Sequence, residues 1–243
     1  MKTMKFCDLH THVLPGVDDG APEMEYALQM LRNAAASDVS LLAVTPHCNR
    51  AFEMPNYLDN HLQERFLLLQ QAAKDIPVEL VLGAEVLVDE FLPQLLQEKK
   101  VPTINGSRYL LTEFHPNTNP EVFPDVLQSI LELGYIPLVA HPERYAAVCK
   151  NPRIVTPWLD MGCHLQLTGG SILGVYGKTV QKTAAVLLKN DYVACVASDA
   201  HGTDSRNNNL LEVQSYLSLY YSRQCAKALL WENPMIIFEN ETF

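Results

Sequence analysis

The sequence predicts an α/β fold built on parallel strands. Three observations support this prediction. Seven short runs rich in Val, Ile and Leu recur along the chain, and amphipathic segments lie between them. Hydrophobic residues make up 48% of the 243 residues and charged residues 19%, which is typical of a chain with a large folded core. Strand–helix units in series favour a parallel sheet that is either open or closed into a barrel.

The apolar runs are the expected strands. They cover residues 5–12, 41–47, 78–86, 108–114, 135–141, 163–169 and 192–201. The segments between them with apolar residues at helical spacing predict helices over residues 22–38, 58–75, 121–134 and 177–191. Pro22 occupies a plausible first helical position of the first segment. Because no long linker, repeat or low-complexity stretch is visible, we expect residues 1–243 to form a single domain.

Composition narrows the possible partners. The net charge of −10 argues against broad binding of nucleic acid or of anionic membranes, although a local cationic site can still bind a small anion. No apolar run reaches the ~18 residues of a membrane span, and no signal peptide follows Met1. The six cysteines form no CxxC pair, so we expect reduced thiols and a cytoplasmic protein.

Ionisable side chains end six of the seven expected strands. In parallel barrels the carboxyl ends of the strands meet at one face, so these residues should converge there. They are His10, His12, His47, Glu85, Glu113, His141, Asp199 and His201. Such residues are rare in apolar strands, so their repeated occurrence at strand ends points to a shared site. The other three histidines lack this context; His115, two residues beyond Glu113, is expected near the site without ligating.

Eight nitrogen and oxygen ligands exceed what one four-coordinate zinc ion takes. They predict two or three divalent ions, with Zn, Mn or Fe favoured over Ca or Mg. His10 and His12 have i, i+2 spacing, which places both side chains on one face of a strand. Arg144 and Arg206 follow two of the ligand positions within a few residues. Beside a cluster of metal ions, two arginines suggest a phosphate ester as the substrate.

The motifs "DLHTH", "VDDG", "TPH", "GAEV", "NGSRYLLTEF", "AHPERY", "DMGC" and "ASDAH" occur in this order along the chain. Together they resemble the PHP (polymerase and histidinol phosphatase) superfamily. More narrowly, they are similar to its bacterial protein-tyrosine phosphatases of capsular and exopolysaccharide operons, the CpsB/YwqE type. The resemblance runs from about residue 5 to the "ENP" near residue 233.

This resemblance implies a distorted (β/α)7 barrel, a trinuclear metal centre and hydrolysis of phosphotyrosine. It places the metal ligands on the eight residues identified above and the phosphate-binding arginines on Arg144 and Arg206. The acid of "VDDG" falls on Asp18 or Asp19. The mechanism this implies has a hydroxide that bridges the metal ions and attacks phosphorus in line, while Asp18 or Asp19 protonates or orients the leaving phenolate. No cysteine lies in a CxxxxxR phosphate loop, so a cysteine nucleophile is not indicated.

The resemblance also implies a partner, the phosphorylated tyrosine-rich tail of a cytoplasmic tyrosine autokinase. Phosphate would be the product. The segment "CNRAF" after His47 belongs to a loop that varies within the family, which leaves the target peptide open. Three alternatives stay open at this point: a histidinol-phosphate phosphatase, a non-catalytic module of polysaccharide assembly, and a metal-dependent nuclease-like activity. The acidic charge disfavours the nuclease.

Overall fold

The structure is a computed structural model that describes residues 5–49 and 54–243. Part of the "CNRAF" segment, residues 50–52, therefore lies outside the described residues. The strands are β1 (Phe6–Thr11), β2 (Val39–Val44), β3 (His47–Asn49), β4 (Met54–Pro55), β5 (Glu79–Leu82), β6 (Glu85–Leu87), β7 (Tyr109–Glu113), β8 (Ile136–Ala140), β9 (His164–Thr168) and β10 (Cys195–Ala197). All seven expected strand regions contain strands, which confirms the prediction from the apolar runs.

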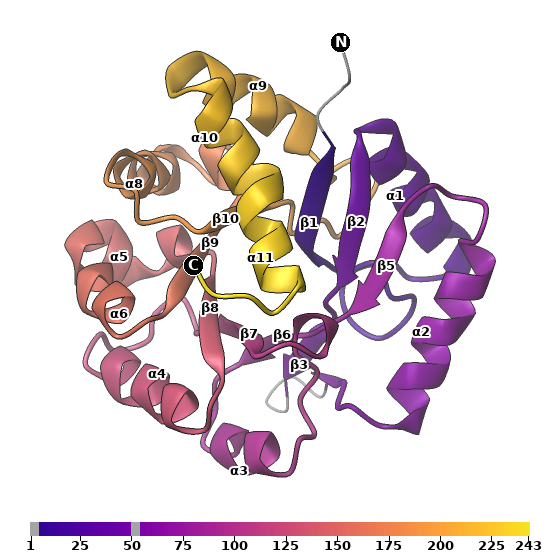
Figure 1. The fold of residues 1–243 in the computed structure, drawn as a ribbon, viewed down its shortest axis with the longest axis horizontal. Coiled ribbons are helices and arrows are strands. Elements are labelled where there is room, and N and C mark those ends of the chain that lie inside the picture. The colour runs from indigo at the N-terminus through magenta and orange to yellow at the C-terminus, as the bar shows by residue number, and fades with distance from the viewer. Residues whose placement is uncertain (1–4, 50–53) are drawn as a thin grey trace.

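The helices surround the strands, as Figure 1 shows. They are α1 (Met24–Ala36), α2 (Asn60–Ala72), α3 (Leu92–Gln97), α4 (Val122–Glu132), α5 (Ala146–Lys150), α6 (Thr156–Asp160), α7 (Gly169–Ile172), α8 (Lys178–Lys189), α9 (Leu210–Tyr220), α10 (Arg223–Lys227) and α11 (Asn233–Phe238). Each of the four predicted helices is present with trimmed ends. Pro22 lies outside α1, because Glu23 is its N-cap residue, so its predicted place in the first turn was wrong.

The parallel strands are divided between two sheets. One sheet has the order β1-β2-β5, and the other has the order β10-β9-β8-β7-β6-β3-β4, in which only the short β4 runs antiparallel to its neighbour. The second and third expected strands are each interrupted, at 45–46 and at 83–84. Pro46 has no N–H for a ladder bond, and Gly83 is packed so closely that a Cβ there would lie 3.1 Å from Thr45 Cγ2.

The two sheets meet at two seams. At the first seam the chain passes from β2 to β3 and from β5 to β6, and the pairing of these two segments continues across the interruption, since Gly83 N donates to Val44 O (2.9 Å) and Glu85 N donates to Pro46 O (3.1 Å). At the second seam His12 N donates to Ala200 O and Asp199 N donates to His10 O, both at 2.9 Å. The seven parallel segments therefore follow one another around a distorted, interrupted ring, and these seams hold several of the candidate ligands in register.

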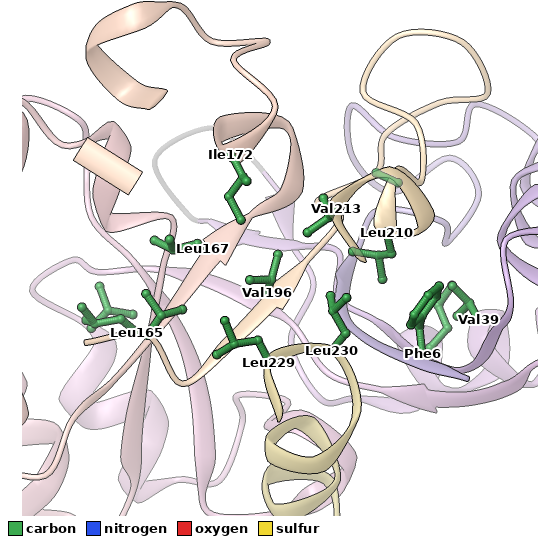
Figure 2. Close-up of a cluster of buried hydrophobic side chains, with 14 of the residues drawn as sticks. Phe6, Val39, Leu165, Leu167, Ile172, Val196, Leu210, Val213, Leu229 and Leu230 are labelled. Atoms are coloured by element: carbon green, nitrogen blue, oxygen red, sulfur yellow. The ribbon is translucent and has the colours of Figure 1, made fainter. Parts of the chain in front are cut away.

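Apolar side chains fill the ring and close one of its ends. A buried cluster in its interior includes Cys7, Leu9, Leu111 and Leu138 together with Ile237 of α11. A larger cluster lies between the strands and the surrounding helices. Figure 2 shows part of it, where Leu210, Val213, Leu229 and Leu230 lie around Val196 of β10. Because α11 packs against the interior cluster, the carboxyl ends of the strands are left to form the functional site.

All six cysteines are free thiols. No helix in the described part of the chain has both the length and the apolar character needed to cross a membrane.

Candidate metal centre

The end of β1 brings the Nε2 atoms of two tilted imidazoles close together. Nε2 of His10 lies 3.1 Å from Nε2 of His12, and both side chains are fully buried. The other ring nitrogens have fixed acceptors: His10 Nδ1 donates to Gln166 Oε1 (2.9 Å) and His12 Nδ1 donates to Asp18 Oδ2 (2.8 Å). Gln166 Nε2 donates to the carbonyl of Leu167, which fixes the amide with its oxygen toward His10.

These hydrogen bonds place the proton of each neutral ring on Nδ1. Two Nε2 lone pairs then face each other in a buried space, which is unfavourable unless a proton or a metal ion lies near both. The donor set is therefore suited to a cation. A carboxylate or amide on the far nitrogen is also the usual support for a histidine that ligates a metal.

Glu85 lies at the centre of the cluster and is 1% exposed. Its two carboxylate oxygens contact four imidazoles: His141 at 2.6 Å, His47 at 3.0 Å, His10 at 3.2 Å and His12 at 3.3 Å. The start of β6 fixes this position, because β6 pairs with β3 and aligns Glu85 with His47. One carboxylate shared by four imidazoles can bridge cations rather than serve a single ion.

Asp199 is a second buried carboxylate of the cluster. Its Oδ1 lies 3.5 Å from Nε2 of both His10 and His12, and 3.4 Å from Nδ1 of His201. Asp199 is 1% exposed and contacts both candidate phosphate-binding arginines. The structure thus brings together residues from both sheets and from both seams of the ring.

Three groups of side chains, drawn from the described residues, could each hold a metal ion. They are His12, Asp19, His47 and His201; His10, His12 and Glu85; and His47, Glu85 and Glu113. Each pair of groups shares one residue. His141 and Asp199 belong to none of the groups but contact their members directly. All eight predicted ligands therefore lie in one cluster, and Asp19 joins them as a ninth candidate.

The histidines and carboxylates of the cluster shift each other's pKa values. Burial would lower the pKa of His10, but the charges of Glu85 and Asp199 outweigh it and raise that pKa to about 9. Burial also opposes protonation of His47, yet Asp19 and Glu85 raise its pKa to about 11. Burial and the charge of Glu85 raise the pKa of Glu113 to about 8. Protons thus compensate the carboxylates of this cluster, which is what a cation would do in their place.

Asp18 and Asp19 have different surroundings. The side chain of Asp18 is fully buried, and its oxygens accept from His12 Nδ1, from His47 N (3.0 Å) and from Gly20 N (3.0 Å). Asp19 is 51% exposed and lies 3.3 Å from Nε2 of both His47 and His201. A Cβ on Gly20 would lie 1.9 Å from His12 O, so only glycine allows this loop to fold back onto β1.

Two arginines lie beside the cluster. Arg144 Nη2 donates to Asp199 Oδ2 at 2.7 Å, and its guanidinium stacks on the ring of Tyr176, 4.0 Å from the centroid. Arg206 contacts Asp199 at 3.4 Å and Asp19 at 3.5 Å, and it is 36% exposed. The Nε atoms of both arginines are buried and have no hydrogen-bond partner among the described residues. Two unpartnered N–H donors beside a cation site are suited to an anion.

The backbone is strained at this site. His141, Asp199 and Arg206 have positive φ angles of 33°, 54° and 48°. Residues other than glycine adopt this region at a cost, and such residues are concentrated at functional sites. The strain accompanies three of the residues that the sequence singled out.

Several supporting residues escaped the sequence analysis. Gln166 lies within an apolar strand, and its isolated polar character was the available signal. Asn56 donates to the carbonyls of His47 (2.7 Å) and Val17 (3.2 Å), which connects two ligand-bearing segments. Tyr176 gave no signal at all, because its contact with Arg144 depends on the tertiary fold. His115 lines the same cavity as Glu113 and belongs to none of the three groups.

Known proteins resemble the chain over nearly its whole length. The family model for capsular polysaccharide synthesis proteins of the CpsB/CapC type matches residues 6–239. The tyrosine-protein phosphatase CpsB of Streptococcus pneumoniae is 32% identical, over 96% of this chain and 98% of that protein. The tyrosine-protein phosphatase YwqE of Bacillus subtilis is 28% identical, over 97% and 92% of the two chains.

A solved structure agrees with these matches. It is described as one of the crystal structures of YwqE from Bacillus subtilis and CpsB from Streptococcus pneumoniae, unique metal-dependent tyrosine phosphatases. It superposes with a TM-score of 0.90 at 28% identity, covering 98% of this chain and 96% of that one. The chain therefore belongs to the CpsB/CapC family of capsular polysaccharide synthesis proteins.

Proposed function

We propose that this protein is a metal-dependent protein-tyrosine phosphatase of bacterial capsular or exopolysaccharide synthesis. The observation that carries the proposal is the pair of facing Nε2 atoms on His10 and His12, 3.1 Å apart, close to Asp199, which contacts both arginines. The names of the relatives supply the reaction, because CpsB and YwqE are named tyrosine-protein phosphatases.

The residues of the centre fit two or three divalent ions such as Mn, Fe or Zn. The eight predicted ligands His10, His12, His47, Glu85, Glu113, His141, Asp199 and His201 would hold them, with Asp19 as a further carboxylate. Divalent ions bound there would lower the pKa of a coordinated water and stabilise negative charge on phosphoryl oxygens. Asp18 acts by orienting His12, since both of its oxygens already accept hydrogen bonds.

Arg144 and Arg206 hold the phosphoryl group in this proposal. Their buried Nε atoms have no partner among the described residues, so each has an N–H available for an oxygen of the substrate. Asp19 is 51% exposed and lies 3.5 Å from Arg206, whereas the side chain of Asp18 is fully buried. It is therefore better placed than Asp18 to orient or protonate the leaving phenolate, whose ordinary pKa of ≈ 10 makes it a fair leaving group.

The substrate we propose is the phosphotyrosine-bearing tail of a tyrosine autokinase, which would place the protein in the cytoplasm. Exposure of Asp19 (51%) and Arg206 (36%) leaves the centre accessible to a flexible peptide. Residues 1–243 would act as one catalytic domain, with inorganic phosphate as the product.

Metal analysis and phosphatase assays on the same purified sample test this proposal. We expect at least two equivalents of a divalent transition metal, and hydrolysis of phosphotyrosine peptides that chelation abolishes and metal restores. Hydrolysis of histidinol phosphate that is far faster than that of phosphotyrosine peptides would point instead to a small-molecule phosphatase. A fully metal-loaded protein without phosphatase activity would support a non-catalytic role and would overturn the proposal.

A further inference from the structure

A cavity of about 340 Å³ opens beside the more exposed side of the metal centre. This volume lies within the range of pockets that bind small molecules. Three of its lining residues, Asp19, His47 and Glu113, are candidate metal ligands. The remaining lining residues are Met54, Leu87, His115 and Pro116. One side of the cavity is thus polar and in contact with the cluster, and the other side is mainly apolar.

The apolar side comes from one end of the larger sheet, where the order is β7-β6-β3-β4, and it is held by backbone hydrogen bonds. Met54 lies on β4, Leu87 ends β6, and Pro116 follows β7. Leu87 is aligned with Glu113 in the parallel ladder, and Val88 N donates to Glu113 O at 2.9 Å. Ala146 N donates to Pro116 O at 2.9 Å, which fixes the loop after β7. The wall is therefore a built part of the fold.

The arginines are not among the residues that line this cavity. Both contact Asp199, which follows β10, whereas the cavity borders β3, β6 and β7. Arg206 also lies 3.5 Å from Asp19, a lining residue, so the arginines and the cavity are neighbours. A phosphate ester that bridges the two areas would have its phosphoryl group near the arginines and its leaving group in the cavity. An aromatic ring suits an apolar wall of this kind, because burial of its faces is favourable and the phenolic oxygen stays at the polar end.

We propose that this cavity binds the aromatic ring of the substrate, with Leu87 and Met54 as residues that determine specificity for aryl phosphates. The inference rests on the proposed phosphatase function and extends it, because it assigns a subsite and a reason for selectivity. Phosphate binding and ring binding are then separate contributions from two neighbouring areas of the centre.

A second cavity nearby provides a matched control. It measures about 430 Å³ and is lined by Pro55, Tyr57, Leu58, Asp59, Leu95 and Lys100. None of these residues belongs to the candidate metal groups of the described chain. Leu58 is 39% exposed, so its replacement by serine is a change of the same kind at a site without access to the centre.

The test compares Leu87→Ser and Met54→Ser with Leu58→Ser in the metal-loaded enzyme. For each variant we would measure KM for a phosphotyrosine peptide, the inhibition constant of inorganic phosphate, and metal content. We expect KM to rise ~10-fold in Leu87→Ser, about the loss of one partly buried aliphatic contact. The phosphate inhibition constant and metal content should not change, and Leu58→Ser should match wild type.

Equilibrium binding of phenylphosphonate, an aryl phosphate analogue that is not hydrolysed, separates this inference from the function on which it rests. Selective weakening of phenylphosphonate binding relative to phosphate in Leu87→Ser supports the subsite even where turnover is not observed. Equal weakening of both ligands would overturn the inference, since Leu87 would then support the phosphate site. A larger effect in Leu58→Ser than in Leu87→Ser would also overturn it, because the ring would then lie in the second cavity.

Discussion

The buried and the exposed residues of the metal centre are held in place in different ways. The inner set is at most 6% exposed and comprises His10, His12, Glu85, His141, Asp199 and His201. The outer set is 18–51% exposed and comprises Asp19, His47, Glu113 and Arg206. Three inner imidazoles have acceptors outside the set or on the backbone: Gln166 Oε1, Asp18 Oδ2 and the carbonyl of Asp199. The side chains of the outer set mainly contact other members of the centre.

This difference indicates a division of roles. Inner side chains keep their positions through hydrogen bonds that do not involve a bound ion, so they should determine whether metal binds. Outer side chains lie next to solvent and to the cavity, so they should determine how substrate is held. Changes to the inner set are therefore expected to affect metal content, and changes to the outer set to affect kinetics at constant metal content.

Glu85→Gln should give the largest effect. It removes the charge from a carboxylate that four imidazoles share in a buried space. We expect loss of bound metal and a fall in activity beyond the ~10–100-fold typical of residues that only support a ligand. Elemental analysis, peptide assays and thermal unfolding with and without metal check this, and the metal-dependent rise in Tm should vanish. Glu79→Gln, at an exposed strand position, is the control. A Glu85→Gln protein that keeps its full metal content and its activity would contradict the proposed division of roles between the inner and outer sets.

Arg144→Ala should leave metal content intact and reduce kcat/KM on phosphotyrosine peptides by roughly 10²-fold or more, the effect of losing one transition-state donor. Arg144→Lys should recover only part of the activity, because an ammonium does not reproduce the planar guanidinium. Arg206→Ala should cost less, since Arg206 is 36% exposed and its contacts are 3.4–3.5 Å long.

Exposed Arg32 pairs with Glu25 on α1, so Arg32→Ala is the matched control for both arginines. An Arg144→Ala enzyme with full metal and near-normal kcat/KM would assign Arg144 to a structural ion pair with Asp199. A greater loss in Arg206→Ala than in Arg144→Ala would reverse the proposed order of the two arginines.

Metal affinity should depend on pH. The raised pKa of His10, a member of the inner set, gives the direction of this dependence. The pKa of His10 is raised to about 9 without a bound ion, so His10 is protonated at neutral pH. A metal ion needs the unprotonated Nε2 and must displace that proton, so apparent affinity should fall as pH falls below about 9. One displaced proton corresponds to about tenfold per pH unit. Calorimetry in buffers of different ionisation enthalpy would detect the released protons, and an affinity independent of pH would contradict this assignment.

The sequence was informative where local pattern decides the structure. Strand positions followed from apolar runs, and the clustering of the eight candidate ligands followed from His, Glu and Asp at the ends of those runs, because parallel strands bring their carboxyl ends together. The interruptions at 45–46 and 83–84 were not predicted, since an apolar run does not show where a strand changes sheets.

The distinction between Asp18 and Asp19 was also beyond the sequence. The two aspartates are adjacent and chemically identical, and they differ only because Gly20 lets the loop fold onto His12 O. Gln166 and Tyr176 act through residues far away in the chain, at His10 and Arg144. Local spacing carries no information on such contacts, which depend on the completed ring.

Tyr176 is the positioning residue of Arg144, and its replacement should give the smallest effect. Its ring packs on Gly170, where a Cβ would lie 3.0 Å from Tyr176 Cε2, and its face lies 4.0 Å from the Arg144 guanidinium carbon. A contact of this kind at a partly exposed site contributes ~0.5–1 kcal/mol. Tyr176→Leu should therefore lower kcat/KM ~2–5-fold, with a matching rise in the phosphate inhibition constant. Tyr176→Phe retains the aromatic face and should restore both values, with metal content unchanged throughout. If phenylalanine were as harmful as leucine, the hydroxyl rather than the stacked ring would be responsible, and the guanidinium of Arg144 would be held by Asp199 alone.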